Sequence, residues 1–225
     1  MFKNILSKVC CCLKYPHFYG KSSFSQEGED LILQQLFNRK KKGFYLDIGS
    51  FHPYKYSNTQ KLYQKGWHGI NIDANPDGIE LFKLARDRDV NLVAGIGNKK
   101  GKKQYFLFKD PALNTFNEKV KSEVVNSRQS TLIGEERVDV YPITYILKKY
   151  VKNKHIDFLN IDCEGESFNI LKSIKFKKFC PEVIAVEREN MGRKITKDKV
   201  IVFMEKAGYH LVSATNMTYL FKYSV

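Results

Sequence analysis

The sequence predicts an α/β fold built around a mostly parallel β-sheet, on three observations. Short apolar runs that end on glycine or an acidic residue alternate with stretches whose apolar residues recur at helical spacing. Such alternation requires parallel strands joined by crossover helices. The last two apolar runs instead alternate like two strands joined by a short turn, which predicts an antiparallel hairpin. With 225 residues, 43% of them hydrophobic, the chain can form one domain around one core.

The first half of the chain is expected to supply a helix and then three buried strands. Ser25 has the character of an N-cap, because acidic residues and then apolar residues at helical spacing follow it, and this helix would end near Asn38. Pro76 suits the first turn of a later helix. The run Q-Y-F-L-F at 104–108 would extend the sheet or its edge. The expected strands occupy 43–49, 67–73 and 90–97, with helices at 58–64 and 76–86.

The second half continues the alternation after a long irregular stretch. Residues 110–134 are polar and weakly periodic, and a loop of this length inside a domain is usually functional or disordered, so they are predicted to form a lid over a site. Gly208 would end the last helix in the left-handed conformation. Strands are expected at 137–141, 156–162 and 182–189, helices at 144–150, 166–174 and 197–207, and the hairpin strands at 209–214 and 218–223.

The formal net charge of +14 raises the question of a polyanionic partner. Much of the excess lies in short runs at predicted element boundaries, at 39–42, 99–103 and 175–178, where a solvated surface is the usual explanation. An RNA-binding or RNA-modifying function is the alternative that this charge suggests. No specific nucleic-acid partner is expected, because the basic residues are scattered and no K/R-G-F-type motif for stacking bases is present.

The N-terminal segment 1–21 is basic and contains the adjacent Cys10, Cys11 and Cys12. The sequence has no run of about 18 apolar residues, no small-residue cleavage site and no C-x-x-C pair, so a spanning helix, a secretory signal and a disulfide framework are not predicted. A reducing cytoplasm is the expected location. The segment is interpreted as a frayed terminus, and the alternative is an acylated segment lying weakly on the inner face of an anionic membrane.

Four predicted strands end on an acidic residue, namely Asp47, Asp73, Asp162 and Glu187. Ligands of open parallel sheets bind beyond the carboxyl ends of the strands. Carboxylates seldom end buried apolar strands without a partner, because desolvating the charge costs several kcal/mol. The four residues therefore predict a ligand site at this edge of the sheet.

The first strand end, Y-L-D-I-G-S-F-H-P-Y at 45–54, contains a single glycine. Gly49 would allow a ligand to approach the backbone closely, while Asp47 can accept hydrogen bonds from it. The loop lacks the G-x-G-x-x-G that places a pyrophosphate at a helix N-terminus, which disfavours a nicotinamide-dependent oxidoreductase. A cofactor with an adenine, a ribose and an amino-acid tail but no phosphate fits better. Asp73 suits the ribose hydroxyls, and the alternative is that it caps the next helix.

Several segments, in this order and spacing, resemble FkbM-type S-adenosylmethionine-dependent methyltransferases. They are S-Q-E-G-E-D (25–30), Y-L-D-I-G-S-F-H-P (45–53) with S-N-T (57–59), G-W-H-G-I-N-I-D-A-N-P (66–76), I-D-F-L-N-I-D-C-E-G-E (156–166) and V-I-A-V-E (183–187). The resemblance covers about residues 22–222 and assigns 22–225 to a methyltransferase domain. It implies a class I (Rossmann-like) fold, with a seven-stranded, mostly parallel sheet whose last strand is antiparallel. It also implies O-methylation with S-adenosylmethionine as the methyl donor. Many relatives methylate sugars or polyketide-type hydroxyls.

The resemblance further implies which residues contact S-adenosylmethionine. Asp47 and Gly49 would meet its methionine part, Asp73 its ribose, and Gln26 would close over it. The full set of implied cofactor contacts is Gln26, Asp47, Gly49, Ser50, Asp73, Ala74, Asn75, Ala94, Gly95 and Asp162. The chain departs from the family pattern at Ser50, Phe51 and Pro53, where Ala, Asn and Gly are common, so Phe51 and His52 are expected to face the acceptor.

The acceptor side needs a group that removes the hydroxyl proton, or a cation that acidifies the hydroxyl. Asp162 and Glu164 would point the same way in a strand-like register. The segment is similar to that of metal-dependent sugar O-methyltransferases, which implies Asp162 and Glu187 as ligands, Glu164 as the base, and His52 as an additional base or ligand. Oxygen ligands suit magnesium or manganese, whereas a histidine favours iron or another transition metal.

Each of these acidic residues also has a structural interpretation. Asp162 or Glu164 could cap the following helix, Glu187 could pair with Arg188 or a neighbouring lysine, and His52 could be a hydrogen-bonded loop residue. The expected acceptor is a hydroxyl of a sugar or glycan precursor, including a nucleotide-linked one. A non-sugar small molecule is the alternative.

Overall fold

The computed structural model describes residues 21–152, 154–188 and 198–224. Residues 1–20, which hold Cys10, Cys11 and Cys12, lie outside the described residues, so contact of this segment with a membrane stays a prediction. Within the described ranges, none of the helices has the length and apolar character needed to span a bilayer.

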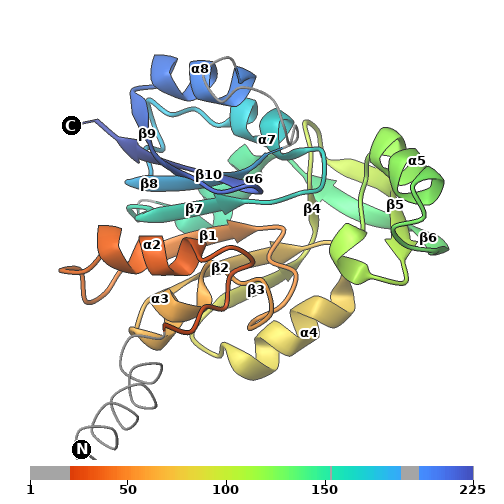
Figure 1. The fold of residues 1–225 in the computed structure, drawn as a ribbon, viewed down its shortest axis with the longest axis horizontal. Coiled ribbons are helices and arrows are strands. Elements are labelled where there is room, and N and C mark those ends of the chain that lie inside the picture. The colour runs from red at the N-terminus through yellow and green to blue at the C-terminus, as the bar shows by residue number, and fades with distance from the viewer. Residues whose placement is uncertain (1–20, 153, 189–197, 225) are drawn as a thin grey trace, which may run out of the picture.

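A seven-stranded sheet forms the centre of the molecule (Figure 1). Its strands are β1 (Phe44–Ile48), β2 (His68–Asp73), β3 (Val90–Val93), β7 (Phe158–Ile161), β8 (Val183–Glu187), β9 (Tyr209–Ala214) and β10 (Thr218–Tyr223). The order is β3-β2-β1-β7-β8-β10-β9, and β10 is antiparallel to both of its neighbours, while the other pairings are parallel. The predicted seven-stranded sheet with a C-terminal antiparallel hairpin is confirmed.

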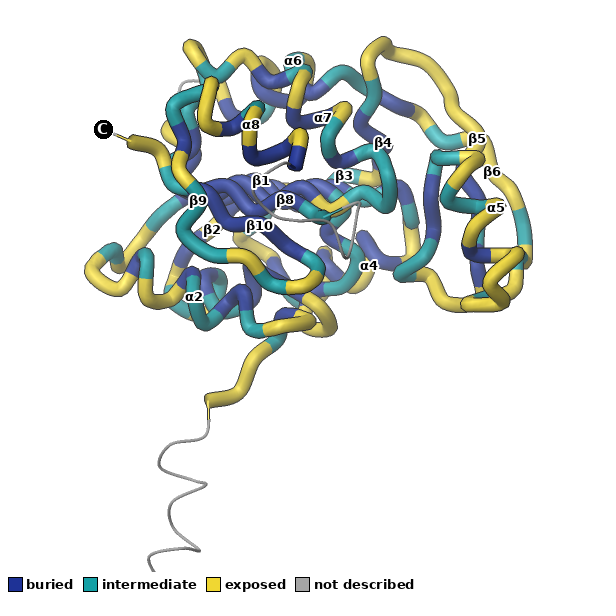
Figure 2. The backbone as a smooth tube through the Cα atoms, turned by 45° about the horizontal axis from the view of Figure 1, so that its top comes forward, coloured by how far each residue is buried: buried dark blue, intermediate teal, exposed yellow. Residues whose placement is uncertain are grey.

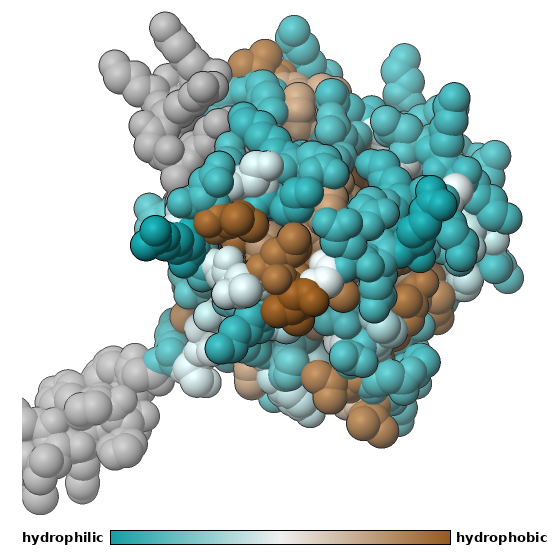
Figure 3. Space-filling view, turned by 90° about the vertical axis from the view of Figure 1, so that its right-hand side faces the viewer, coloured by the Kyte–Doolittle hydropathy of each residue, from teal (hydrophilic) through white to brown (hydrophobic). Residues whose placement is uncertain are grey.

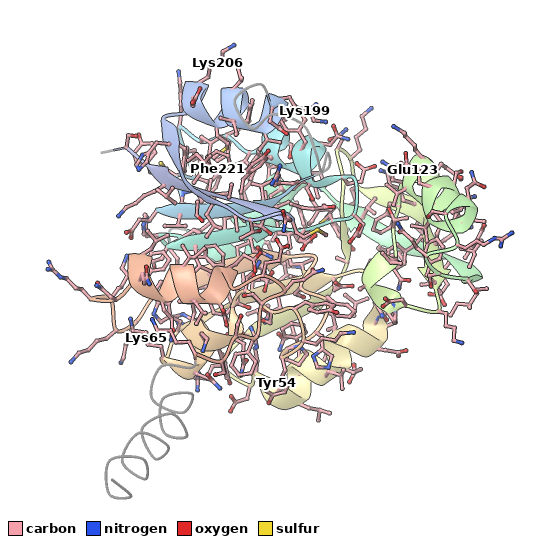
Figure 4. The ribbon with its side chains drawn as sticks, viewed as in Figure 1. Tyr54, Lys65, Glu123, Lys199, Lys206 and Phe221 are labelled. Atoms are coloured by element: carbon pink, nitrogen blue, oxygen red, sulfur yellow. The ribbon has the colours of Figure 1, made fainter. Side chains whose placement is uncertain are left out.

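Helices cover both faces of this sheet, so its central strands are buried on both sides (Figure 2). One face carries α2 (Glu29–Leu36), α3 (Gln60–Gln64) and α4 (Pro76–Ala85). The other carries α6 (Ile143–Ile146), which continues as the π-helix η2 (Leu147–Val151), with α7 (Ser167–Ser173) and α8 (Lys199–Lys206). Figure 4 shows Lys206 on the outer side of α8 and Phe221 within the sheet, where Phe221 is fully buried.

The alternation along β1 assigns its side chains to two different cores. Leu46 and Ile48 belong to the core beneath α6, α7 and α8. Tyr45 belongs to the core beneath α2 and α3, together with the fully buried Trp67. Because side chains alternate along a strand, Asp47 lies on the same face as Tyr45. This placement decides the role of Asp47 below.

A second, three-stranded sheet lies beside the carboxyl edge of the first (Figure 1). It contains β4 (Gly95–Ile96), β5 (Gly101–Phe108) and β6 (Leu132–Tyr141), in the order β4-β6-β5. The prediction of one strand over 90–97 is therefore wrong, because pairing with β2 stops at Val93 and Gly95 pairs with Val140. The prediction that 104–108 extends the main sheet is also wrong, since this run pairs with β6.

The segment 110–134 is more ordered than a loop. It contains the 3₁₀ turn η1 (Pro111–Leu113) and the helix α5 (Glu118–Asn126), and its end enters β6. Asn117 caps α5, because its Oδ1 accepts hydrogen bonds from the backbone N–H groups of Lys119 and Val120. Val124 packs against Phe106 and Phe108 in a small separate core. Figure 3 shows mainly hydrophilic residues on the face that carries β5, β6 and α5.

The start of the first described helix differs from the prediction. The helix α2 begins at Glu29, after Gly28 in the left-handed conformation, and not after Ser25. The reason is a folded turn, in which Asp30 accepts hydrogen bonds from the backbone N–H of Phe24 and the hydroxyl of Ser23. Ser25 still binds a helix N–H, that of Asp30. The predicted left-handed conformation of Gly208 is confirmed.

Candidate active site

A cavity with about 830 Å³ of space, part of it open to solvent, lies between the carboxyl edge of the main sheet and the second sheet. The predicted residues Gln26, Gly49, Asp73, Ala74, Ala94, Gly95, Asp162 and Glu164 all line it. The segment 110–134 contributes wall residues to it between Pro111 and Phe116. Whether that segment moves as a lid stays a prediction.

Asp73 presents its carboxylate to this cavity at the end of β2. Its oxygens accept hydrogen bonds of 2.8 Å each from the backbone N–H groups of Phe51 and Asn75. Burial raises the pKa of Asp73, and these hydrogen bonds oppose the rise. The side chain that caps α4 is Asn75, whose Oδ1 accepts from the N–H of Asp77. Asp73 is therefore not the cap, and Asn75 lies outside the residues that line the cavity.

Gly49 is the position where the first strand turns away and the backbone leaves no room for a side chain. Its φ is +77°, and an added Cβ would lie 1.6 Å from the carbonyl oxygen of Asp162. Any other residue would therefore push β1 and β7 apart at the floor of the cavity. Ser50 is buried, does not line the cavity, and has no hydrogen-bond partner for its Oγ among the described residues.

The far wall of the cavity comes from the transition between the two sheets. Ala74, Ala94 and Ile96 give it an apolar surface. At Gly95, an added Cβ would lie 2.6 Å from the Phe116 ring, so glycine lets that ring approach. The small residues and the aromatic ring together form an apolar wall, which suits the face of a planar heterocycle.

A second, smaller cavity of about 370 Å³ adjoins the first. It is lined by Gln26, Glu29, Tyr56, Asn58, Asp162, Glu164, Glu187, Met217 and Thr218. Gln26, Tyr56, Asp162 and Glu164 line both cavities and so form the boundary between them. The site therefore has two compartments that meet at two carboxylates.

Carboxylate oxygens of Asp162, Glu164 and Glu187 lie within 4.8 Å of one another, close enough to share one cation. Glu187 accepts hydrogen bonds from the Ser167 hydroxyl at 2.5 Å and from the Cys163 N–H at 3.2 Å. The cluster does not arise from a strand-like register, because β7 ends at Ile161 and Glu164 has a φ of +32°.

The stretch between η1 and α5 holds the Glu164 turn from outside. The Thr115 hydroxyl donates to the carbonyl oxygen of Glu164 at 2.8 Å, and the Asn117 amide donates to that of Gly165 at 3.2 Å. A non-glycine residue with a positive φ costs about 1–3 kcal/mol and persists only where its surroundings hold it. The contacts of Thr115 and Asn117 therefore position the predicted base.

The acidic cluster shifts the pKa values of its members. Burial first, and then the charges of Glu187, Glu164 and Asp47, raise the pKa of Asp162 well above its usual value. Burial and the Glu187 and Asp110 charges raise the pKa of Glu164 to about 8. A carboxyl group that titrates close to neutral pH is suited to general acid–base catalysis.

Neither Asp162 nor Glu164 caps the helix after β7. The N-cap position of α7 is Glu166, which makes no capping hydrogen bond through its side chain. Arg188 Nη1 donates to the carbonyl oxygen of Thr215, and its guanidinium lies over the Tyr219 ring. The structural interpretations of Asp162 and Glu164 are therefore wrong.

His52 does not join the acidic cluster and does not line either cavity. Its Nδ1 accepts hydrogen bonds of 3.0 Å from the backbone N–H groups of Tyr54 and Lys55, so it closes the loop that carries Tyr54, which Figure 4 shows beside α4. Burial and the charges of Lys55 and Arg86 lower the pKa of His52. The arrangement does not bring His52 to the position expected of a metal ligand or second base.

Asp47 also lies outside both cavities. Its carboxylate is buried between α3 and the sheet, where it accepts hydrogen bonds from Thr59 Oγ1 at 2.8 Å and Asn160 Nδ2 at 2.9 Å. Burial raises the pKa of Asp47, and both hydrogen bonds and the nearby Arg86 charge oppose the rise. The structure therefore does not bring Asp47 to the cofactor cavity.

Sequence reasoning missed the wall that the second sheet supplies. Tyr105, Thr115 and Phe116 line the larger cavity, although they lie in the run read as a sheet extension and in the predicted lid. Asn58, which lines the smaller cavity, belongs to the S-N-T segment that carried the family resemblance, and no role was predicted for it.

The fold and the site together define a Rossmann-like methyltransferase. The chain matches the family described as Methyltransferase FkbM domain over residues 47–211, which is more than half of its 225 residues. The protein therefore belongs to the FkbM methyltransferase family, as the sequence predicted. A search among curated proteins finds no match.

Proposed function

We propose that this methyltransferase transfers the methyl group of S-adenosylmethionine to a hydroxyl of a sugar or glycan precursor. The observation that carries the proposal is the pair of adjoining cavities, one with an apolar wall and one lined by carboxylates. The sulfonium supplies an electrophilic methyl group, and an alcohol is a weak nucleophile at neutral pH. The protein must therefore bring the hydroxyl to the boundary of the two cavities and take its proton.

The residues of the larger cavity fit S-adenosylmethionine. Asp73 would accept hydrogen bonds from the ribose hydroxyls, since a carboxylate is an acceptor only and this one lines the cavity. The apolar wall that contains Ala94, Gly95 and Phe116 would pack against the adenine. Gly49 and Gln26 would lie beside the methionine part. Asp162, at the boundary, would attract its ammonium group.

Glu164 is the residue that we assign to the proton. It lines both cavities, and its raised pKa of about 8 makes its ionised form a stronger base than an ordinary carboxylate, so that form can accept a proton from a hydroxyl as the methyl group transfers. A sugar suits the smaller cavity, because Asp162, Glu164 and Glu187 offer oxygens to the several hydroxyl donors of a polyol.

The acidic cluster also fits a divalent cation. Asp162, Glu164 and Glu187 would hold it through oxygen atoms, which favours magnesium or manganese over a transition metal that prefers histidine. Such a cation would lower the pKa of a bound hydroxyl. Glu164 would then act as a ligand, and proton removal would depend less on its own pKa.

The test is methyl transfer from labelled S-adenosylmethionine to a panel of monosaccharides and nucleotide sugars, with total RNA as a separate acceptor, each with and without chelator. We expect label in a sugar fraction. Label in RNA and in no sugar would overturn the acceptor assignment, and loss of activity with chelator would assign the cation.

A cofactor-binding arm accompanies this assay. Asp73→Ala is expected to weaken S-adenosylhomocysteine binding by about tenfold to a hundredfold, because a hydrogen bond to a charged group contributes about 1.5–3 kcal/mol. Asp77→Ala is the matched control, since this exposed carboxylate lies four residues further along the chain and outside both cavities. Equal affinities in the two variants would remove Asp73 from the cofactor site.

A further inference from the structure

A chain of hydrogen bonds runs through the interior from a buried arginine to the smaller cavity. Arg86 Nη1 donates to Thr59 Oγ1, and this hydroxyl donates to Asp47 Oδ2. Asp47 Oδ1 accepts from Asn160 Nδ2, and Asn160 Oδ1 accepts from Asn58 Nδ2 at 3.0 Å. All five side chains are buried. Asn58 is the last of them and lines the smaller cavity.

The chemistry of these groups fixes the direction of every bond in the chain. An ionised carboxylate can only accept, so Asn160 must turn its NH₂ toward Asp47 and its carbonyl oxygen toward Asn58. Asn58 must then turn its own NH₂ toward Asn160. The orientation of two amides, which by themselves could flip, is thus set by the charge of Asp47.

The positive charge of Arg86 favours the ionised form of Asp47, which can only accept hydrogen bonds. The guanidinium is completely buried and also donates to the carbonyl oxygen of Pro53 and the hydroxyl of Ser57, both in the loop that leads to Asn58. Its contact with Asp47 passes through the Thr59 hydroxyl. Thus the same arginine balances the buried carboxylate and fixes the loop.

The consequence appears in the smaller cavity. Since Asn58 Nδ2 is held by Asn160, its Oδ1 is the atom left for a ligand, and this oxygen makes no hydrogen bond to any residue in the described ranges. Only 7% of Asn58 is exposed, so this polar atom is nearly enclosed. An oxygen in this position lowers the free energy of binding for a ligand that donates a hydrogen bond to it.

We propose that Asn58 is a specificity-determining residue, which binds a hydroxyl donor of the acceptor through Oδ1, and that Asp47 is a positioning residue that acts through Asn160. The identity of the acceptor in this inference rests on the proposed function. The orientation of the Asn58 amide does not depend on it. With Asn58 so oriented, the amide and the three carboxylates of the cavity all offer acceptors. The cavity then selects a donor-rich ligand such as a polyol.

The orientation is tested by NMR on the protein without any acceptor. The side-chain amide signals of Asn58 are assigned by their loss in Asn58→Ala, and their exchange with water is compared with that of exposed Asn38. We expect exchange slowed at least tenfold in the native protein, because the NH₂ group lies against Asn160. Exchange as fast as that of Asn38 would overturn the inference whatever the acceptor is.

The role of Asp47 is tested by comparing two carboxylates that each meet Arg86 through a hydroxyl. Asp47→Asn can present either a donor or an acceptor to Asn160, so the Asn58 amide is expected to lose its slow exchange. Asp89→Asn is the matched control, because Asp89 is bonded to Tyr45, which accepts from Arg86, and lies outside the chain to Asn58. An equal effect of both variants would overturn the role of Asp47.

The binding arm uses the sugar that takes label in the assay above. Asn58→Ala is expected to raise the KM of that sugar about twofold to tenfold, the worth of one neutral hydrogen bond, and to leave the Kd of S-adenosylhomocysteine unchanged. An unchanged KM would overturn the binding role. If no sugar takes label, the proposed function fails, while the exchange of the Asn58 amide still decides the inference. If Asp47→Asn does not fold, the native protein and Asn58→Ala decide it alone.

Discussion

Two neighbouring strands, β7 and β8, carry an acidic residue at each end, and the two ends behave differently. At the amino ends, Asp157 and Glu182 both bind Lys40, at 2.5 and 2.8 Å. Asp157 also accepts from the N–H of Phe44 at 2.7 Å. At the carboxyl ends, the cluster of Asp162, Glu164 and Glu187 opens into two cavities.

The amino-end cluster contains a cation, Lys40, which binds both of its carboxylates. Burial alone would lower the pKa of Lys40, but the hydrogen bonds and charges of Asp157 and Glu182 raise it, so this cluster is satisfied within the fold. Among the described residues, no lysine or arginine forms a salt bridge with Asp162 or Glu164, and the pKa values of both are raised. The acidic residues at the amino ends of β7 and β8 therefore stabilise the fold through Lys40. Those at the carboxyl ends line the candidate site instead.

The largest effect is expected at the carboxyl-end cluster. Glu164→Gln keeps the size of the side chain but cannot take a proton, so kcat is expected to fall by about 10²–10⁴, the usual contribution of a general base. Binding of S-adenosylhomocysteine should stay within about twofold, since the same shape lines the cavity. Single-turnover methyl transfer, measured with calorimetric Kd values, tests this.

Glu166→Gln is the matched control for this substitution. Glu166 follows two residues later and also lines the larger cavity, but lies outside the acidic cluster. It is expected to retain nearly full turnover. Native turnover in Glu164→Gln would remove Glu164 from the mechanism, and a loss shared by both variants would indicate a general effect of charge.

The next effect concerns a cation supplied from solution. Mn²⁺ is expected to stabilise the protein against thermal unfolding by about 2.7 kcal/mol at one hundred times its Kd, since it binds the folded state alone. Asp162→Asn should abolish this shift, and Asp157→Asn should leave it unchanged because Lys40 already occupies the amino-end cluster. Scanning calorimetry measures the shift. An equal shift in the Asp162 variant would place the cation elsewhere.

Lys40→Met is expected to have a moderate effect on stability and none on turnover. It leaves Asp157, a carboxylate that is 9% exposed, without its cation, but the lysine itself is partly exposed and water can replace some of the lost interaction. We expect a loss of about 1–3 kcal/mol in the free energy of unfolding, measured in urea. Lys40→Arg is the control and should cost less than about 1 kcal/mol. A loss of methyl transfer at full folding would contradict the comparison.

The sequence predicted the elements that depend on local pattern. The strand ends at Asp73, Asp162 and Glu187 followed from apolar runs of strand length, and parallel strands bring such ends to one edge. Gly49 and Glu164 followed from the turns after their strands, the resemblance added Gly95, and the structure places all three on the cavities. These residues could be predicted because the position of each depends on a single strand and the turn that follows it.

The parts that sequence reasoning could not supply depend on contacts between distant residues. Pairing of Gly95 with Val140 creates the second sheet, and no local pattern reports it. The face on which Asp47 lies is also not local, because alternation along β1 shows which side chains share a face but not which face holds the cavity. His52 was misplaced for a similar reason, since its partners are the backbone N–H groups of its own loop.

The smallest effect sharpens the comparison through pH. The folded state raises the pKa of Glu164 from 4.5 to about 8, so between these values the folded protein keeps a proton that the unfolded chain has released. Stability is therefore lost as pH rises through this window, by at most about 1.4 kcal/mol per pH unit. Glu164→Gln does not titrate, so its Tm relative to the native protein is expected to rise from pH 5 to pH 8, by about 2–4 °C for each kcal/mol.

Lys40→Met provides the contrasting case in the same experiment. The raised pKa of Lys40 starts from 10.5, so its charge does not change between pH 5 and pH 8, and the difference in Tm between this variant and the native protein should stay level. If the difference in Tm between Glu164→Gln and the native protein also stayed level from pH 5 to pH 8, the charge of the carboxyl-end cluster would already be neutralised in the folded protein. The two acidic ends of β7 and β8 would then not differ in the way that makes one of them a site.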